Sequence, residues 1–321
     1  MQPLLGANDG EPPILEQPAY PGSVHTLKQF LLRILAFAAD HKISMTALEN
    51  LLSTLAFLLP AGNRIPRSKY LLFKLLGINV ERFERHACRA DCHVFPPLEP
   101  SEYEDHAHDA CPTCQQPRFQ RSGASLSPVK RFYVLPIQEQ IAMAKKVPEF
   151  DQSIEKMWNE IQQQGNFLKT FWGGSLAQPY LIRMQDLSDF SRILVFSLGL
   201  DGVQAFGNKQ YEVWPVGLRL WNLHPEERGK KEFILLAALI PGPKAPQRLS
   251  PYLEPILSEI NSSVNGLQTW NASKLEEEML ELEIATTQQD MPSLAKCCVH
   301  VGPSGRVNCS RCNRLSQNNP G

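Results

Sequence analysis

The stretch ILVFSLGLDGVQAFGN, from Ile193 to Asn208, decides the fold, because an apolar run ends in it at one acidic residue followed by glycine. Its first eight residues are aliphatic, aromatic or glycine apart from Ser197, which is typical of a strand buried on both faces. Asp201 is the only charge. A carboxylate there caps a turn, pairs with a cation or binds a metal, because desolvating it alone is costly. An ordinary Asp-Gly turn is the simplest interpretation of these residues by themselves.

Two further apolar runs follow this strand, at 213–221 and 233–240, and the charged turn HPEERGKK separates them. Together the three runs predict a meander of antiparallel strands. Apolar residues at helical spacing then predict a helix over 249–264. We therefore expect the chain to return to the sheet after that helix.

A fourth strand is expected at 280–286, followed by Asp290 and a helix-like segment. Three antiparallel strands, a helix, a fourth strand and a helix is the order of an RNase H-like mixed sheet, in the α+β or α/β class. Such a sheet would gather Asp201 and Asp290 side by side. Paired carboxylates at adjacent strand ends suit the divalent ions of phosphoryl transfer.

The composition indicates a globular protein, with 43% hydrophobic and 20% charged residues in a length of 321 that allows about two domains. A net charge of −1 gives no overall basic field to hold nucleic acid. The first 23 residues are polar and proline-containing, so a loose tail is expected and no signal peptide. The apolar segment 45–59 is shorter than the ~20 residues of a membrane span, so no membrane segment is expected.

The region after this tail is expected to be helical. Apolar spacing predicts helices over 26–39, from the N-cap Ser44 to residue 59, and over 68–76. A mildly basic set accompanies them, which suits either a phosphate-contacting face or, more simply, a solvated one: Arg64, Arg67, Lys69 and Lys74.

The first cysteine cluster, in HACRADCHVF and DACPTCQQPRF, has the pattern C-x3-C-x18-C-x2-C. Two such knuckles fit tetrahedral coordination of a structural zinc ion by four thiolates: Cys88, Cys92, Cys111 and Cys114. Free or disulfide-bonded cysteines are the alternative, which an intracellular location disfavours. Histidines nearby offer substitute ligands: His86, His93, His106 and His108.

A second cysteine cluster follows Asp290, made of Cys297, Cys298, Cys309 and Cys312. Only Cys309 and Cys312 have knuckle spacing, so they are a candidate second zinc half-site. The sequence then divides as follows: a disordered tail 1–23, a helical region 24–86, a zinc-binding knuckle 87–120, a connector with a helix 121–185, a partial RNase H-like catalytic domain 186–315, and a tail 316–321.

These blocks together resemble the CACTA (En/Spm-type) transposases over roughly 27–312. The segments ACRADCHVF and YEDHAHDACPTCQQPRF are similar to that family's cysteine stretch, and SLGLDGVQAFGN resembles its strand-Asp-Gly-x-x-Pro-Phe-Gly block, with Ala205 in place of proline. LIPGPKAPQRLSPYLEPILSEI is similar to its Pro-Gly-Pro-Lys and helix block. QDMPSLAK and GPSGRVNCSRC resemble its Asp-x-Pro-Ala helix and late Cys-x-x-Cys.

The resemblance implies that Asp201 and Asp290 are two members of an acidic triad that binds Mg²⁺ or Mn²⁺ for DNA cleavage and strand transfer in the nucleus. The third acid of the family comes from a later helix, whereas this chain ends 31 residues after Asp290, so a catalytically incomplete fragment is expected and its status as an enzyme stays open. DNA at transposon ends is the implied partner. The expected fourth strand would also leave an exposed sheet edge, which predicts association with a second copy or with a full-length transposase.

Two other interpretations remain open. A domesticated, non-catalytic zinc-binding module that contacts DNA or protein would need the cysteines of 88–114 and be indifferent to the aspartates. An unrelated metal-dependent nuclease would need further acids, for which 276–283 offers glutamates that are more simply explained as a solvated approach to a strand.

Overall fold

The computed structural model describes residues 12–77, 83–164, 170–187, 189–204 and 211–288 of the chain. The chain folds as two compact units, Met1–Arg82 and Phe83–Gly321, which are described separately. Asp290, the following helix-like segment and the second cysteine cluster lie outside the described residues. Among the described helices, none has both the length and the apolar character needed to cross a membrane.

The first unit contains the three predicted helices. Thr26 caps the first in a capping box with Gln29, and the Ser44 hydroxyl accepts a hydrogen bond from the backbone N–H of Ala47 at 3.2 Å, as the sequence predicts. The helices bury their apolar faces on one another around Leu31 and Leu52. Their bounds are α1 Leu27–Asp40, α2 Met45–Leu58 and α3 Lys69–Leu75, after a short η1 at Ile14–Glu16.

The segment before α1 differs from the expected loose tail in its described part. Ala19 is fully buried, and its carbonyl accepts a hydrogen bond from the backbone N–H of Arg64 at 2.9 Å. Pro18 forms an antiparallel bridge with Thr26. These contacts hold the segment against the helices although its proline-rich composition gives no periodic signal.

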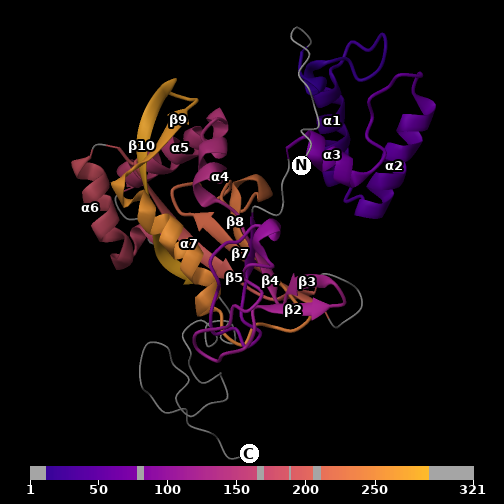
Figure 1. The fold of residues 1–321 in the computed structure, drawn as a ribbon. Helices are drawn as coiled ribbons and strands as arrows, with labels where there is room; N and C mark the ends of the chain where they lie inside the picture. The colour runs from indigo at the N-terminus through magenta and orange to yellow at the C-terminus, as the bar shows by residue number, and fades with distance from the viewer. Residues whose placement is uncertain (1–11, 78–82, 165–169, 188, 205–210, 289–321) are drawn as a thin grey trace, which may run out of the picture. The chain divides into compact units, whose positions relative to one another are not determined.

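The second unit is built on one mixed sheet with the order β1-β4-β8-β7-β5-β10-β9, to which β6 adds beside β7 (Figure 1). Every pairing is antiparallel except that of β5 with β10. The strands are β1 Glu84–His86, β4 Arg131–Val134, β5 Ile193–Leu200, β6 Val203–Gln204, β7 Glu212–Leu220, β8 Ile234–Pro241, β9 Leu267–Asn271 and β10 Glu276–Gln288. A separate hairpin joins β2 Phe119–Ser122 to β3 Ser125–Pro128.

The centre of this sheet confirms the predicted meander and the returning strand. β5, β7 and β8 are consecutive antiparallel neighbours, and α7 then carries the chain back to β10 on the other side of β5. The parallel register runs from Glu281 opposite Ile193 to Gln288 opposite Gly199. Strand ends of β5 and β10 therefore meet at one edge of the sheet.

The sheet is wider than expected at both sides. β1 falls in the expected helical region and β4 in the expected connector, yet both extend the sheet beyond β8. On the other side, β10 begins at Glu276, because residues 276–280 pair with β9. The expected bare edge strand is thus covered over its first half, whereas 281–288 pair only with β5 among the described residues.

Helices pack on this sheet around a single apolar core. α7 contributes Tyr252, Ile256 and Ile260, which are at most 4% exposed. α5, the helix expected in the connector, buries Ile154 and Met157. The bounds are α4 Ile137–Ala144, α5 Pro148–Gln164, α6 Gln178–Asp186 and α7 Ser250–Ser262, with short 3-10 helices η3 Pro100–Glu102, η4 Phe171–Gly173, η5 Ser175–Ala177, η6 Lys231–Phe233 and η7 Ser263–Asn265.

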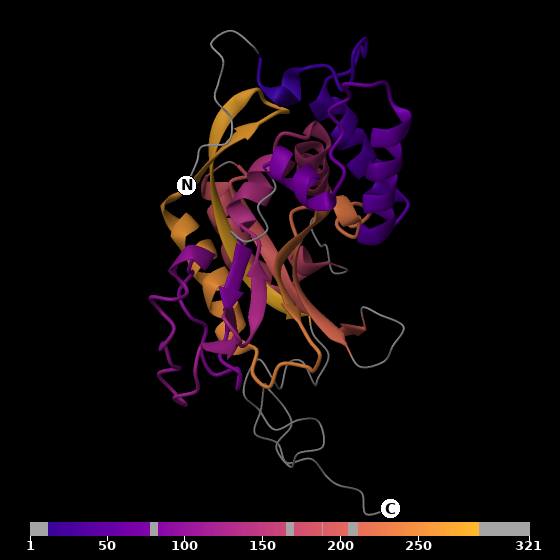
Figure 2. The same ribbon diagram turned by 45° about the vertical axis from the view of Figure 1, so that its right-hand side comes forward.

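The loops that carry the cysteines lie at one end of the sheet, opposite the β9 hairpin, in both views of the ribbon (Figures 1 and 2). They follow β1, whose last residue, His86, pairs with the first residue of β4, Arg131. Antiparallel pairing continues to β8 and β7, so the ends near the cysteines are the end of β8 and the start of β7. Because β7 is antiparallel to β5, the start of β7 lies beside the end of β5. The cysteine loops therefore lie at the sheet edge that is formed by these strand ends, where β5 ends.

Candidate functional site

Asp201 lies directly after β5 at this edge and is exposed. Its Oδ1 accepts a hydrogen bond from the backbone N–H of Gly202 at 2.7 Å, which is the local bond of an Asp-Gly turn. The interpretation of Asp201 as part of an Asp-Gly turn is therefore correct, and the turn engages one of its two carboxylate oxygens. Oδ2 has no hydrogen-bond partner among the described residues and remains available to a cation or solvent.

Gly202 is required at this position by the packing of Trp214 from β7. A Cβ atom on residue 202 would lie 2.8 Å from Cε2 and Cζ2 of the indole ring, closer than any tolerated contact. The indole Nε1 in turn donates to Glu212 Oε2 at 3.2 Å, which fixes the ring. The Asp-Gly pair is thus set by a tertiary contact as well as by turn chemistry.

A depression of about 460 Å³ borders Asp201 on one face of the sheet. Gly199 and Gly217 form its floor as a cross-strand pair, so the backbone is accessible there without side chains above it. The hydroxyl of Ser197, also in the lining, is buried and has no hydrogen-bond partner among the described residues. A ligand at this depression could approach both the backbone and Asp201.

The four cysteines of the first cluster converge on one point. Each of their Sγ atoms lies within 4.8 Å of the others, and no other group of three or more metal-ligand residues occurs in the described part of the chain. The Sγ of Cys92 lies 3.5 Å from that of Cys88, 3.4 Å from that of Cys111 and 3.6 Å from that of Cys114. All four are free thiols. Tetrahedral zinc with bonds of about 2.3 Å separates its sulfurs by roughly 3.8 Å, so the set fits such an ion.

Two tight turns create this convergence. In the first, the backbone N–H of Cys88 donates to the carbonyl of His93 at 2.9 Å, and Asp91 takes a left-handed conformation with φ of 54°. In the second, the backbone N–H of Cys111 donates to the carbonyl of Gln116 at 2.8 Å. Both turns close an antiparallel bridge, between Ala87 and Val94 in the first and between Ala110 and Pro117 in the second.

The second turn also prepares its first cysteine for a cation. Burial acts to raise the pKa of the Cys111 thiol, but the backbone N–H groups of Cys114 and Thr113 and the neighbouring thiols lower it to about 6. Burial raises the pKa of the Cys88 and Cys92 thiols, so the lowered pKa favours the thiolate that a metal requires at Cys111 and not at those two.

Arg118 connects the two cysteine turns, and its side chain is buried, with 3% exposed. Its Nε donates to His86 Nδ1 at 3.1 Å, its Nη1 to Asp109 Oδ2 at 3.1 Å and its Nη2 to the Pro96 carbonyl at 2.8 Å. His86 accepts at Nδ1 and contacts Tyr103 and Glu84 through Nε2. Burial first, and the surrounding arginines second, lower the pKa of His86 to about 3, so it serves as a neutral structural side chain here. The alternative of a histidine ligand is thus not needed, since four sulfurs form the cluster.

Asp91 ties the first turn to the sheet. Its carboxylate is 2% exposed, accepts hydrogen bonds from the Lys130 ammonium and the Tyr252 hydroxyl, and accepts a third from the backbone N–H of Gln247 at 2.8 Å. Tyr252 lies on α7, and Gln247 follows the Pro-Gly-Pro-Lys loop. The cysteine loops and the sheet edge are therefore one connected structure.

The glutamates of 276–283, considered above as alternative metal ligands, are engaged elsewhere. Glu281 pairs with Arg183 of α6 at 2.5 Å, and Glu283 also pairs with Arg183. Glu281 lies opposite Ile193, eight residues before Asp201, which at about 3.3 Å per residue is roughly 26 Å along the strand. These acids are at the wrong end of the sheet to join Asp201.

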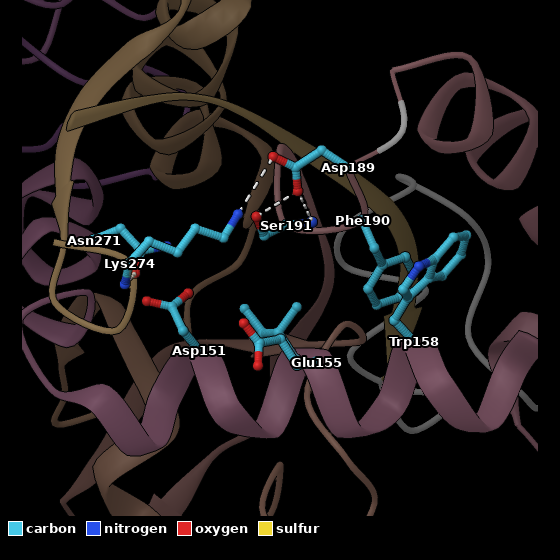
Figure 3. A pocket seen from close by; sticks show the side chains of 9 residues that line it. Asp151, Glu155, Trp158, Asp189, Phe190, Ser191, Asn271 and Lys274 are labelled. Atoms are coloured by element: carbon cyan, nitrogen blue, oxygen red, sulfur yellow. Dashed lines mark hydrogen bonds and ion pairs between the residues drawn. The ribbon is translucent and has the colours of Figure 1, made fainter. Parts of the chain in front are cut away.

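A second polar pocket, of about 230 Å³, lies at that other end (Figure 3). Asp151 points into it from α5 toward Lys274, and Glu155 of the same helix and Asp189 also line it (Figure 3). Asp151 is also bound to the buried ammonium of Lys145 at 2.5 Å. Lys145 and Lys274 thus pair with Asp151 and Asp189, and the acids of this pocket do not form a metal-ligand group among the described residues.

Sequence patterns identified Asp201 and the four cysteines but missed the residues that join them. Asp91, Lys130 and Tyr252 come from three distant segments. Asp91 and Tyr252 lie in stretches already quoted for their cysteines and for the Pro-Gly-Pro-Lys loop, but no pattern links either residue to the other. The charge of Asp91 between two cysteines was the only local signal, because a charged residue there needs a partner.

Comparison with protein families gives a match in the second unit. No curated protein matches the chain. Residues 182–319, which include β5, Asp201, β7, β8, α7 and β10, match the model of the Transposase family tnp2, so this segment of the chain is similar to a transposase family.

Proposed function

We propose that the sheet edge at Asp201 is the catalytic edge of a CACTA-type transposase, where Asp201 and Asp290 hold a divalent ion for phosphoryl transfer on DNA. The observation that carries this is the pairing of β5 with β10. The last pair, Gly199 with Gln288, comes two residues before Asp201 on one strand and two residues before Asp290 in the sequence. Two carboxylates that follow a parallel pair at equal distances are suited to share one ion.

The strand order supports an RNase H-like assignment of this sheet. Along the chain, these four strands come in the order β5, β7, β8 and β10. In the sheet they lie side by side as third, second, first and fourth, and the single parallel pairing joins the first, β5, to the fourth, β10. The match of residues 182–319 to a transposase family covers these strands. DNA is the proposed partner, and the nucleus is the proposed compartment.

The bound ion would polarise a phosphate oxygen and activate the attacking water or hydroxyl. The chain itself contributes the other requirements. Asp201 offers an uncommitted carboxylate oxygen, Gly202 fixes its backbone against Trp214, and the Gly199–Gly217 floor lets a ligand approach closely.

The test is Mn²⁺ binding, followed by the disappearance of the free-ion electron paramagnetic resonance signal. Asp201→Asn and Asp290→Asn should each weaken binding at least 10-fold, because each removes one of two charged ligands. Asp186→Asn, an exposed aspartate on α6, is the matched control and should bind as the parent does. Plasmid cleavage with Mg²⁺ or Mn²⁺ is expected to follow the same pattern. Equal Mn²⁺ binding by the parent and both variants would show that the proposed site is wrong.

We also propose that the four-cysteine cluster holds a structural zinc ion. Four thiolates close the coordination sphere, so no position is left for substrate and the ion would stabilise the turns. Cys111→Ser or Cys114→Ser should each lower the zinc content by one equivalent, measured by release to a chromogenic chelator. Ser125→Ala, in the exposed hairpin nearby, should leave it unchanged. Unchanged zinc in both cysteine variants would exclude this site.

The same variants distinguish the transposase proposal from the alternative of a non-catalytic zinc-binding module. It requires DNA or protein binding to depend on Cys111 and Cys114 and to survive both aspartate substitutions. Under the transposase proposal, metal binding at the sheet edge depends on Asp201 whether or not zinc is removed.

A further inference from the structure

A groove of about 680 Å³ lies between the first cysteine turn and the Pro-Gly-Pro-Lys loop at 241–244. Its walls come from the cysteine turn, from the end of β3 through β4, from Tyr211 before β7 and from the loop after β8. Among the described residues, Asp91 is the only carboxylate in its lining. Four cations line it: Arg89, Lys130, Arg131 and Lys244.

The acidic groups around the groove compensate only two of these cations. Lys130 is bound to Asp91, and Arg131 Nε lies 3.4 Å from Glu84 Oε1. Arg89 and Lys244 are exposed and form no ion pair with any carboxylate in the described ranges. A local excess of positive charge therefore exists at this groove, although the net charge of the chain is −1.

The groove opens on the same face of the sheet as the depression beside Asp201. Pro215, in the lining of the depression, pairs with Leu239 of β8, and Leu239 pairs with Tyr133 of β4, in the lining of the groove. Residues directly opposite each other in antiparallel strands point to the same side. One face thus carries both hollows.

The two hollows are also close along the sheet edge. Arg131 begins β4, which is three strands from β5, so at about 4.8 Å per strand it lies roughly 14 Å sideways from the strand that ends at Asp201. That distance equals the rise of about four base pairs of duplex DNA. A phosphate chain held in the groove could therefore continue across β8 and β7 to Asp201.

We propose that this groove binds the phosphate backbone of double-stranded DNA and directs it to Asp201. The inference deepens the proposed function, since it names the surface that holds the substrate of that edge. Lysine and arginine contacts to phosphates carry most of the affinity of non-specific DNA binding. Arg89 and Lys244, on opposite walls, provide the uncompensated contacts, and Gly242 lets the loop lie against the backbone of Glu212 because a Cβ there would overlap it.

The test uses the full, zinc-loaded chain and a fluorescein-labelled 20-base-pair duplex of arbitrary sequence, with no Mg²⁺ or Mn²⁺ added. The double variant Arg89→Gln/Lys244→Gln should weaken binding about 10-fold at 100 mM salt. The slope of log K against log salt should fall by about two, one for each lost phosphate contact. Both side chains are exposed, so the fold should be retained, which thermal unfolding checks.

The matched control is Lys146→Gln/Lys231→Gln. It removes the same charge from exposed lysines after α4 and in the turn between β7 and β8, at the other end of the sheet. Binding should change less than twofold. Equal weakening by the two double variants would mean that only overall charge matters, and unchanged binding by the groove variant would mean that DNA lies elsewhere; either result overturns the proposal.

The same binding assay distinguishes DNA from other ligands that the groove could hold. A glutamate peptide of equal charge that binds more tightly than the duplex would identify a protein-binding groove and overturn the DNA assignment, as would tighter binding of a single strand. The proposal is also separable from the proposed function. Asp201→Asn should bind the duplex normally, so a failed Mn²⁺ test leaves the groove standing, whereas a failed groove test leaves the metal site standing.

Discussion

Asp91, in the turn between Cys88 and Cys92, accepts a hydrogen bond from the hydroxyl of Tyr252 on the helix that crosses the sheet. Burial, and next the nearby Asp91 carboxylate, raise the pKa of Tyr252, so the hydroxyl keeps its proton and remains a donor. Through this bond the position of the cysteine turn depends on the packing of α7.

Tyr252→Phe should lower the free energy of unfolding by about 1–3 kcal/mol, because a buried carboxylate loses one of its donors. All five tryptophans lie in the unit Phe83–Gly321, so tryptophan fluorescence in urea follows this unit. Tyr180→Phe is the control: the Tyr180 hydroxyl has no hydrogen bond to another described residue, and the change should stay within about 0.5 kcal/mol.

A double-mutant cycle with Asp91→Asn tests the pair directly. If the two side chains act through one hydrogen bond, the combined loss should be smaller than the sum of the single losses. Strict additivity would contradict the contact between Asp91 and Tyr252.

Arg118→Lys should destabilise the zinc-loaded chain by about 2–3 kcal/mol, because a lysine cannot donate to His86, Asp109 and the Pro96 carbonyl together. Arg121→Lys, three residues along the chain and exposed on β2, should change stability by less than about 0.5 kcal/mol. Urea unfolding and the rate of zinc release to a chelator measure the two effects. Similar behaviour of the two variants would mean that the fork of Arg118 does not hold the cysteine turns.

Gly202→Ala should cost about 1–3 kcal/mol, because the new methyl group would press on the indole ring of Trp214. The displaced ring should also shift the tryptophan emission spectrum of the folded protein. Gly229→Ala is the matched control, since nothing lies within 4 Å of a Cβ at that position. If Gly202→Ala is as stable as Gly229→Ala, the indole does not fix the Asp-Gly turn.

Lys145→Met should lower the free energy of unfolding by about 3–5 kcal/mol at pH 7, because the fully buried ammonium lies 2.5 Å from both Asp151 and Glu278. Burial raises the pKa of Asp151, and Lys145 opposes that rise, so its removal raises this pKa further. A carboxyl whose pKa is raised on folding costs stability above its folded pKa and none below its unfolded pKa, near 4.

The stability gap between the parent and Lys145→Met should therefore be larger at pH 7 than at pH 5. Urea titrations at the two pH values measure it. The neighbouring exposed Lys146→Met should show no gap at either pH, within about 0.5 kcal/mol. A gap that is constant with pH would mean that Asp151 does not titrate in response to Lys145.

The sequence predicted the centre of the second unit because its elements are long and periodic. The apolar run 193–200 and the spacing of α7 are signals that lie within one element. The places of the short strands could not be predicted, for the opposite reason. β1 contains 3 residues, too few to show alternation, and the places of both β1 and β4 in the sheet are decided by hydrogen bonds to strands far along the chain.

The glutamate-rich start of β10 shows the same limit. Glu276, Glu277 and Glu278 are typical of a solvated approach, yet they form a strand because β9 supplies the backbone partners and Lys145 the charge that Glu278 needs. Composition alone could not reveal either partner.

The sequence by itself determined the spacing of the four-cysteine cluster, the acidic end of β5 and the strand order around it. Only the tertiary structure decided that the cysteine turns, the Pro-Gly-Pro-Lys loop and the end of β5 share one edge of one sheet. The physical reason is that this arrangement depends on pairing between short, distant strands and on buried polar contacts such as that of Asp91, whose partners lie 39 and 161 residues away.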